Sequence, residues 1–464
     1  MLRAFFGRGF IVRGPINYTT KSLRFLSTEF KDTISKSDNS TKQNIPDFKS
    51  EMEHWEKMLK RYPVLPSETS SDISYYKKFD TLPESFETTN SKDQLVLKTI
   101  SDSYCELWLP FRDAPSLLNQ YVNQQGEIRV GKILEDLDRL AGAIAYKHTS
   151  DIDGQIKNLV IVTAAVDRID IHEYLDSDCI YKASGHVVHV GYSSIDISLV
   201  LNKVLSTEEG SSEKPCLTAR FTMVARNRDT GKAEQINPLM LSSEKERIAF
   251  KTSELIKREK SLLNKKGLEK TPPNFVESRI MHKIWIEAKK YTNNDYNSSS
   301  MNKDFVWLDD TTMSSVHVCF PSERNIHHKV FGGFLMRVGH ELAYANACMY
   351  SGANPISKSL DDFSFTKPVN VGSILRLTSQ VIYSSDLDST EQSHDDKHFQ
   401  VSVKVDVLDP TKQTIETTNT FYFTFESNSP VRRVIPRTYD DMIKYIEGRR
   451  RSQIGSFISN AQQI

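Results

Sequence analysis

The chain lacks the features that define several large classes of protein. Its 464 residues contain no apolar run near the roughly 18 residues that a membrane-spanning helix needs. The five cysteines are scattered without a C-x-x-C pair, which argues against a disulfide framework and is typical of a reducing compartment. Basic and acidic residues number 60 each, so the net charge of zero gives no general attraction to nucleic acid.

Several catalytic and cofactor-binding motifs are missing as well. No G-x-S-x-G segment occurs, which argues against a Ser-His-Asp hydrolase, and neither G-x-G-x-x-G nor a P-loop is present. His186 and His189 stand three apart in a strand-like run and would face opposite sides of a sheet, so they do not predict a metal site. Cys319 and Cys348 lie in apolar surroundings and are interpreted as core residues. We therefore expect no metal and no other cofactor.

The first 28 residues differ from the rest in composition. They contain Arg3, Arg8, Arg13, Lys21 and Arg24, and the first acidic residue is Glu29. Apolar residues are interleaved with the arginines, so no secretory apolar stretch forms. This composition is typical of a mitochondrial transit peptide, which predicts that the protein works in the mitochondrial matrix. Residues 29–94 are polar and irregular, with one short helical candidate near Met52–Arg61.

A glycine pair followed by a long apolar helix is the most informative segment that the chain does contain. Gly332 and Gly333 precede a helix predicted at about 334–349, whose apolar residues recur at helical spacing. The N-terminus of a helix offers unpaired backbone N–H groups and the positive end of the helix dipole. Such a helix start can hold a phosphate, a carboxylate or a developing oxyanion.

The same order of elements occurs earlier in the chain. A second helix of equal length opens at Gly131, which lies 202 positions before Gly333. A short apolar segment ending in proline precedes each helix, and a strand-like run with an aspartate follows each, at Asp167 and at Asp362. Turns beginning at Asp229 and Asp409 are interpreted as equivalent hairpins. The offsets of 202, 195 and 180 residues shrink, which would mean longer loops in the first copy.

This duplication predicts the domain organisation. We expect one α+β unit at 95–241 and a second at 306–428, each with a long helix and an antiparallel sheet. Residues 242–305 contain a capping box at Ser243 and Glu246, and they are predicted to form a helical connector. Residues 429–464, with Arg449–Arg451, are interpreted as a basic C-terminal tail that forms a solubilising terminal helix.

One acidic residue of the first helix lies near its apolar stripe. Asp138 is placed at the flank of the stripe, while Glu135 and Asp136 are expected to point further outward. A carboxylate at the edge of a buried face needs a partner or a chemical role, because desolvation of its charge is costly. Pairing with Arg139, with Lys132 or with a backbone amide is the structural alternative.

Three segments resemble one protein family. They are RVGKILEDLDRLAG at 129–142, VFGGFLMR at 330–337 and LDDFSFTKPV at 360–369. They are similar to the mitochondrial double-hotdog acyl-CoA thioesterases, the acyl-CoA thioesterase nine group, and the resemblance spans about residues 95–430. It implies an α+β fold of two tandem hotdog domains, each a long central helix wrapped by an antiparallel sheet. It also implies a hydrolase that converts acyl-CoA and water into a fatty acid and CoA.

The resemblance also implies a site shared between the two units. Asp138 lies seven positions after Gly131 and matches the acidic position of the family, and Asn325 lies seven before Gly332 and matches its asparagine. Asp138 would act as general base or nucleophile, and the N–H groups of Gly332 and Gly333 would bind the thioester oxygen. Asn325 would orient the water or the carbonyl group.

Further residues are assigned to substrate binding and to a second, mirror-related site. Lys329 and Arg337 flank the glycine pair and are candidates for binding the phosphates of CoA. In the mirror site the candidates are Asn123 and Glu341, because Glu341 is expected on the apolar face of its helix. His340 stands at the position that matches Asp138, so we expect one working site and one degenerate site.

Two other functions stay open at this point. A hotdog hydratase or dehydratase would use an aspartate–histidine pair, and His340 is the histidine that such an enzyme would need. A non-catalytic acyl-CoA sensor or a subunit of a larger assembly is the second alternative. The expected partners are acyl-CoA and further copies of the chain in a homo-oligomer, without nucleic acid.

Overall fold

The computed structural model describes most of the chain beyond residue 94. The described residues are 95–151, 158–207, 210–265, 267–268, 270–293, 305–325, 329–361, 363–365, 367–384, 397–410 and 412–462. The predicted transit peptide, the irregular segment 29–94 with its helical candidate, and Asp362 lie outside them.

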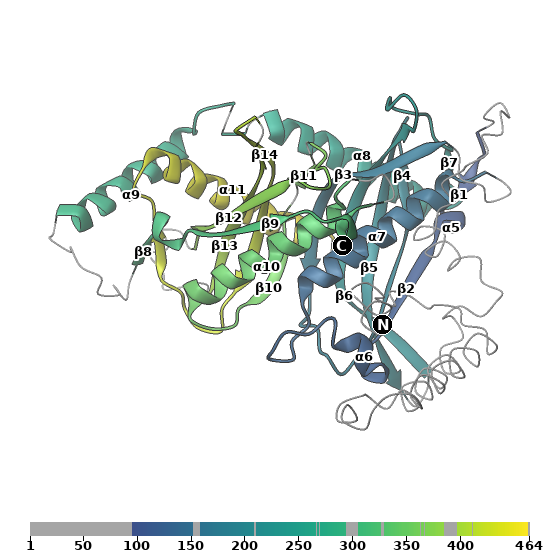
Figure 1. The fold of residues 1–464 in the computed structure, drawn as a ribbon, viewed down its shortest axis with the longest axis horizontal. Helices are drawn as coiled ribbons and strands as arrows, with labels where there is room; N and C mark the ends of the chain where they lie inside the picture. Colours follow the sequence, from purple (N-terminus) through teal and green to yellow (C-terminus); the bar gives the residue numbers. More distant parts are fainter. Residues whose placement is uncertain are drawn as a thin grey trace, which may run out of the picture.

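The first unit is a long helix packed on five antiparallel strands (Figure 1). The helix is α7 (Val130–Thr149), and the strands follow the order β2-β4-β5-β6-β3 across the sheet. Their bounds are β2 Cys105–Pro110, β3 Leu159–Ile171, β4 Ile180–Val190, β5 Ser194–Thr207 and β6 Gly210–Asn227.

The second unit repeats this plan. Its helix is α10 (Gly332–Ser351), and the strand order β9-β12-β13-β14-β10 matches that of the first unit strand for strand. The bounds are β9 Met313–Val318, β10 Ile356–Leu360, β12 Ile374–Tyr383, β13 His398–Asp409 and β14 Thr414–Glu426. The short strand β11 (Phe363–Ser364) pairs with β3 of the first unit.

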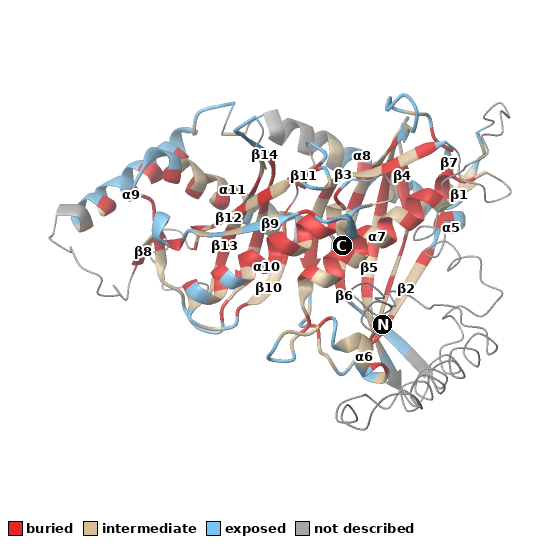
Figure 2. Ribbon diagram, in the orientation of Figure 1, coloured by how far each residue is buried: buried red, intermediate tan, exposed pale blue. Residues whose placement is uncertain are grey.

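Strands β3 and β10 join the two sheets into one. They pair antiparallel, with Ser359 opposite Asp170 and Leu360 opposite Ile169. Helices α7 and α10 lie side by side and contact each other, and their facing surfaces belong to the buried core (Figure 2). The prediction of an α+β fold with two tandem hotdog units, each a long helix wrapped by an antiparallel sheet, is confirmed.

Sequence periodicity explains the central elements. In α7 the residues Ile133, Leu137, Leu140 and Ile144 form a buried stripe at helical spacing. Strand β13 alternates strictly, and its inward residues Phe399 to Val405 are at most 1% exposed. Helix α10 ends at Gly352, whose φ of 69° is the left-handed conformation that glycine adopts without strain.

The predicted equivalence of the turns at Asp229 and Asp409 is wrong. The turn after Asp409 joins β13 to β14, and the equivalent hairpin of the first unit follows Thr207, between β5 and β6. Thr207 lies 202 positions before Asp409, the same offset as for the helices. Asp229 lies beyond β6, in a turn of its own, so the first copy does not have longer loops at this point.

Shorter elements complete each unit. Strand β1 (Lys98–Thr99) pairs in parallel with β7 (Leu239–Met240), and β8 (Phe305–Trp307) pairs in the same way with β15 (Arg433–Ile435). The remaining helical turns are α5 Ile100–Ser103, η2 Phe111–Asp113, α6 Pro115–Leu118, η3 Asp309–Thr311 and η4 Pro321–Glu323.

Three further helices lie outside the central pair. Helix α8 (Glu244–Lys265) contacts β4, and α11 (Tyr439–Gln462) contacts β12. Helix α8 follows β7 as α11 follows β15, so each unit carries its own outer helix, and α9 (Phe275–Asn293) lies between them in sequence. Within the described part of the chain, no helix combines the length and apolarity needed to cross a membrane.

Residues 429–464 do contain the expected terminal helix, but its interpretation as a merely solubilising element is wrong. Helix α11 buries Met442, Tyr445 and Ile446 in a second core that it shares with α9. Arg450, part of the basic run Arg449–Arg451, donates two hydrogen bonds to Glu277 of α9, at 2.6 and 2.8 Å. Net basic composition hid the apolar stripe, because the arginines of this helix serve as ion-pair partners.

We predict that Tyr445→Ala destabilises the second unit. Tyr445 is 1% exposed and its ring packs edge-on against Tyr383 at 5.2 Å, so its removal should cost about 3–5 kcal/mol of unfolding free energy. Urea unfolding monitored by circular dichroism measures the loss. Tyr439→Ala is the matched control, because Tyr439 of the same helix is 66% exposed and should change stability by less than about 0.5 kcal/mol. Equal stability of both variants would show that α11 does not pack as described.

Candidate active site

The two central helices approach so closely that each requires a glycine at the contact. A Cβ atom on Gly333 would lie 2.9 Å from Glu135 Cα, and a Cβ atom on Gly131 would lie 3.1 Å from the backbone oxygen of Arg337. The first distance leaves no room for a Cβ atom, and the second would require the backbone of Arg337 to shift. The first turn of each helix is therefore packed against the backbone of the other.

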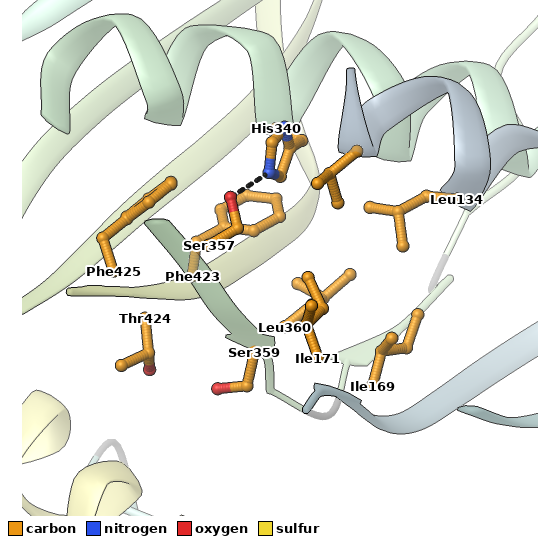
Figure 3. Close-up of a pocket in the computed structure, with 11 residues that line it drawn as sticks. Leu134, Ile169, Ile171, His340, Ser357, Ser359, Leu360, Phe423, Thr424 and Phe425 are labelled. Atoms are coloured by element: carbon orange, nitrogen blue, oxygen red, sulfur yellow. Dashed lines mark hydrogen bonds between the residues drawn. The ribbon is translucent and has the colours of Figure 1, made fainter. Parts of the chain in front are cut away.

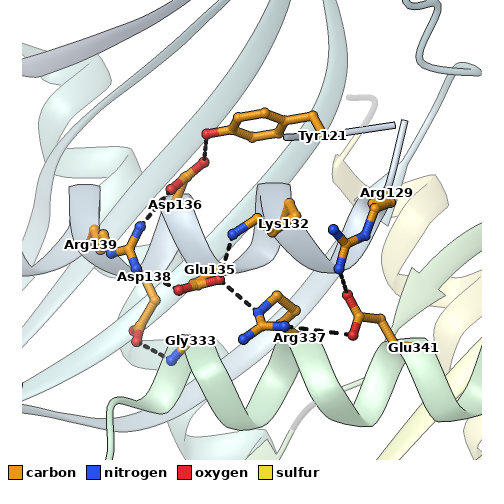
Figure 4. A network of polar contacts seen from close by, with 10 residues as sticks. All are labelled: Tyr121, Arg129, Lys132, Glu135, Asp136, Asp138, Arg139, Gly333, Arg337 and Glu341. Carbon is orange, nitrogen blue, oxygen red and sulfur yellow. Dashed lines mark hydrogen bonds and ion pairs between the residues drawn. The ribbon is translucent and has the colours of Figure 1, made fainter. Parts of the chain in front are cut away.

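This contact brings Asp138 of the first unit against the glycine pair of the second. The Gly333 N–H donates to Asp138 Oδ2 at 2.6 Å (Figure 4), and the hydroxyl of Thr163 donates to Asp138 Oδ1 at 2.7 Å. A Cβ atom on Gly332 would lie 3.1 Å from Asp138 Oδ2. The contact thus joins Asp138 to Gly332 and Gly333, which lie 194 and 195 positions later in the sequence.

Burial makes the charge of Asp138 costly. The residue is 1% exposed, and this desolvation raises the pKa of its carboxyl group to about 6. The hydrogen bonds from Thr163 and Gly333 act in the opposite direction, since both stabilise the ionised form. A carboxyl group with a pKa near the working pH is suited to take up and release a proton.

Glu135 is buried, so the expectation that it points outward is wrong. Its side chain is 5% exposed and pairs with three cations, Lys132 at 3.3 Å, Arg139 at 2.5 Å and Arg337 at 2.8 Å (Figure 4). Arg337 belongs to the second unit, so this cluster bridges the two helices. Lys132 and Arg139, two of the partners considered for Asp138, pair with Glu135 instead. The third, a backbone amide, is the partner that Asp138 has.

Asp136 is likewise held rather than solvated. Its carboxylate accepts a 2.5 Å hydrogen bond from the hydroxyl of Tyr121 and pairs with Arg139 at 3.0 Å. Burial raises the pKa of Asp136 as well. Of the three acidic residues in this part of α7, however, Asp138 alone contacts the glycine pair in the described hydrogen bonds.

Asn325 closes the loop ahead of α10. Its side-chain oxygen accepts a hydrogen bond from the Lys329 N–H at 3.1 Å, and its own N–H donates to the Lys329 carbonyl at 2.7 Å. Asn123, 202 positions earlier, closes the equivalent loop through the N–H of Glu127 at 2.9 Å. Both asparagines thus have a structural task in shaping the loop that leads into a central helix.

The two basic candidates occupy different environments. Lys329 is exposed, and its ammonium group donates to the side chain of Asn370 at 2.7 Å. Arg337 lies between Glu135 and Glu341, with its guanidinium group 5.2 Å from the ring centre of Phe334. These contacts hold Arg337 at the helix contact, whereas Lys329 stands at the surface of the loop.

The mirror position of Asp138 is held by His340. This histidine is buried, shares a 2.9 Å hydrogen bond with the hydroxyl of Ser357, and has a pKa that burial lowers to about 4 (Figure 3). It lines a small, mostly apolar pocket between α10 and strands of both units. The other lining residues are Val130, Leu134, Ile169, Ile171, Ser357, Ser359, Leu360, Phe423, Thr424 and Phe425.

The expectation that Glu341 lies on the apolar face of α10 is wrong. Its side chain is 35% exposed and forms ion pairs with Arg129 and, at 3.6 Å, with Arg337. The inward position belongs to His340, and the first turn of the facing helix has Val130 in place of a glycine. The mirror site thus lacks both the buried acid and the glycine pair.

Thr163 is the site residue that sequence reasoning missed. It lies 25 positions after Asp138 in strand β3 and reaches the carboxylate only because β3 crosses beneath α7. Its counterpart in the mirror site is Ser357, which bonds to His340 in the same way. Thr163 lies 25 positions after Asp138 and Ser357 lies 17 after His340, so the offset of 202 does not relate the two hydroxyl residues, and the sequence contains no signal that marks Thr163.

The arrangement can perform chemistry on an acyl carbon. A buried carboxylate that gains and loses a proton near neutral pH lies against the N-terminus of a helix, whose N–H groups stabilise developing negative charge. Among the described residues, no group of three or more His, Cys, Asp or Glu side chains could hold a metal ion. The fold and the site together define a double-hotdog thioester hydrolase.

Comparison with known proteins identifies the family. The chain is 35% identical to the human mitochondrial acyl-coenzyme A thioesterase 9 over 361 residues, covering 78% of this chain and 79% of the relative. It is 34% identical to the mouse mitochondrial acyl-coenzyme A thioesterase 10 over 362 residues, with 77% and 80% covered. The chain therefore belongs to the family of mitochondrial acyl-CoA thioesterases 9 and 10, and is an acyl-CoA thioesterase. No family model matches the chain.

One solved structure among the matches is an acyl-CoA hydrolase from Staphylococcus aureus. It was determined in complex with butyryl coenzyme A, coenzyme A and coenzyme A disulfide. It shares 23% identity, covers 34% of this chain and 96% of its own, and has a TM-score of 0.30.

We predict that Gly333→Ala disrupts the helix contact. The new Cβ atom would lie 2.6 Å from Phe331 Cε1 and 2.9 Å from Glu135 Cα, which should cost about 1–3 kcal/mol of stability. The displaced N–H should also lower the rate of thioester hydrolysis about 100-fold. Gly142→Ala is the matched control, because no atom lies within 4 Å of its Cβ position and the change should stabilise α7 by about 0.5–1 kcal/mol. Thermal unfolding and thiol release measure both effects, and a fully active Gly333→Ala protein would contradict the contact.

Proposed function

We propose that the protein hydrolyses acyl-CoA to a fatty acid and CoA at the contact between α7 and α10, with Asp138 as the catalytic acid–base group or nucleophile. One observation carries this proposal: a fully buried carboxylate of one unit accepts a hydrogen bond from the first turn of the other unit's helix. An ionisable group in such an environment is costly to the fold, and groups of this kind concentrate at catalytic sites.

Two routes use the same atoms. In the first, Asp138 takes a proton from water, and the resulting hydroxide attacks the thioester carbon. The C–S bond then breaks, and the leaving CoA thiolate receives the proton from Asp138. In the second, the Asp138 carboxylate attacks the carbon itself, the C–S bond breaks, and the CoA thiolate leaves an acyl-enzyme anhydride. Water then hydrolyses the anhydride to the fatty acid and free Asp138, and one proton of that water passes to the thiolate. A thiolate is a good leaving group, so neither route needs a strong acid.

The start of α10 supplies N–H donors for the oxygen of the thioester. The N–H groups of Phe334 and Leu335 donate to the Phe331 carbonyl, and that of Gly333 donates to Asp138. We assign the Gly332 N–H, which has no acceptor within the helix, as the first donor to the oxyanion. The Gly333 N–H would orient Asp138. It would become a second donor to the oxyanion once its hydrogen bond to the carboxylate is broken. Thr163 holds the other carboxylate oxygen, and Asn325 would orient the water or the carbonyl group.

The substrate assignment follows from the family and from the surface near the site. Both relatives are named as mitochondrial acyl-coenzyme A thioesterases, so we assign acyl-CoA as substrate and the mitochondrial matrix as location. Lys329, exposed on the loop ahead of α10, is the favoured contact for a phosphate of CoA. Arg337 is the weaker candidate, since Glu135 and Glu341 already hold its charge.

The alternatives receive less support. A hydratase or dehydratase would pair an aspartate with a histidine, whereas His340 bonds to Ser357 on the other side of the helix pair. A non-catalytic sensor would retain the buried Asp138 at a cost and without a use for it. We also retain the expectation of a homo-oligomer, because the edge strand β9 exposes Val316 and Val318, followed by Phe320, at 62%, 46% and 60%.

We predict that Asp138→Asn abolishes thiol release from acyl-CoA. Removing a general base typically lowers the rate by about 100- to 10,000-fold, and the isosteric amide preserves the packing. A panel of acyl-CoAs of different lengths, assayed with a thiol reagent, also reports the chain-length preference. Glu341→Gln is the control, and it should retain activity because Glu341 lies in the mirror half. Full activity of Asp138→Asn with loss in Glu341→Gln would transfer the reaction to the mirror site.

We predict opposite pH trends for activity and stability. Hydrolysis requires ionised Asp138, so kcat/KM should rise with pH through about 6 and level off above it. The pKa of Asp138 is raised above its ordinary value of 3.8, so its contribution to stability is complete below that value and is lost as the pH rises through about 6. Asp138→Asn should therefore exceed the wild type in stability at pH 8 by on the order of 2–3 kcal/mol. A wild-type protein that is the more stable one at this pH would contradict the raised pKa.

A further inference from the structure

Helix α9 has two faces of different character. Its inward face buries Ile280, Met281, Ile284 and Ala288 against α11 and β8. This packing fixes which side of the helix points away from the protein. In Figure 1 the helix lies at the end of the second unit, far from the contact of α7 with α10.

The outward face combines large apolar side chains with cations. Phe275, Val276, Trp285 and Ile286 are 77%, 60%, 48% and 42% exposed. The other exposed residues with a large side chain on this face are Arg279, His282, Lys283, Lys289 and Lys290.

No acidic side chain is exposed on the described part of this helix. Glu277 is buried and binds Arg450, and the half-buried Glu287 pairs with Arg433 at 3.2 Å. The outward face is therefore strongly cationic, although the whole chain has a net charge of zero.

We propose that α9 docks the protein on an anionic phospholipid surface. Phe275, His282 and Ile286 recur at i, i+7 and i+11, so they share one stripe along the middle of the outward face. Cations flank this stripe on both sides, with Arg279 on one side and Lys289 on the other. A helix with this combination lies in the interface of a bilayer, where apolar side chains enter the headgroup boundary and lysines and arginines bind anionic lipids.

Helix α8 shows that this surface is not a general property of the outer helices. Its outward face also exposes apolar residues, Ile248 at 57% and Leu255 at 61%. However, Glu244 and Glu254 are exposed among its basic residues, and Arg247 pairs with Glu244 at 3.7 Å. An anionic surface would therefore repel part of α8, while it would attract every exposed charge of α9.

The test measures binding of the full chain to vesicles. Equimolar phosphatidylcholine and phosphatidylglycerol vesicles should sediment the protein at low salt, and phosphatidylcholine vesicles should not. Each basic residue near an anionic surface contributes about fivefold in binding, about 1 kcal/mol, so added salt should release the protein. The emission of Trp285 should shift to shorter wavelength on binding, and the difference from Trp285→Phe isolates it from the other tryptophans.

Matched variants separate α9 from other basic segments. Arg279→Glu, Lys283→Glu and Lys290→Glu combined should weaken binding by at least about 100-fold, since three favourable charges become repulsive. The same change on α8 should leave vesicle binding nearly unaltered. This control combines Lys245→Glu, Arg247→Glu and Lys251→Glu. The double variant Phe275→Ser, Ile286→Ser should weaken vesicle binding without removing its dependence on salt. The comparison is repeated without residues 1–28, because their basic residues would bind the same vesicles.

Three results would overturn the proposal. The first is that the protein does not bind the anionic vesicles at low salt. The second is that the α9 and α8 variants bind equally when both lack residues 1–28. The third is that the emission of Trp285 does not shift in the bound protein. Concentration-dependent self-association that the α9 variant loses, without vesicle binding, would assign the face to a second copy of the chain instead. Thiol release by the variants in the absence of vesicles should match the wild type, which confirms that they fold.

Discussion

The approach of α7 to α10 at their first turns is the constraint on which the rest of the site depends. Gly131 and Gly333 allow the backbones of the two helices to come into contact. This contact places the Asp138 carboxylate of one unit at the helix start of the other. The ion pair of Glu135 with Arg337 spans the same contact. A buried pair contributes little net stability, but losing one partner leaves an uncompensated charge, so the pair fixes the alignment of the helices.

The charges at this contact are exchanged between the two copies. Glu135 and Arg139 of α7 correspond, 202 positions on, to Arg337 and Glu341 of α10, so each acid in one helix matches a base in the other. With the original charges in both copies, Glu135 would face another acid at the contact instead of Arg337. The exchange therefore gives the pair of helices a complementarity that two identical copies could not have.

Much of this could be predicted from the sequence because the signals are local. Helix starts are marked by glycine, the duplication by the repeated order of its elements, and Asp138 by its position beside an apolar stripe. The deep burial of Glu135 was not predictable, since its partner Arg337 is 202 residues away and looks like surface charge in isolation. Thr163 carries no local mark either, because its role arises where a strand passes under a helix. Composition misled at α11, whose arginines obscured the stripe containing Tyr445.

The continuous sheet through β3 and β10 has a consequence for how such a protein can change over time. In a dimer of identical chains, every residue occurs twice, so a change that suits one site is imposed on its mirror image. Here one polypeptide contains both halves, so position 340 can be histidine while the corresponding position 138 is aspartate. The joined strands keep the halves together in a fixed ratio and orientation. A single chain with two such halves therefore allows each half to carry different side chains at corresponding positions, which a dimer of identical chains cannot do.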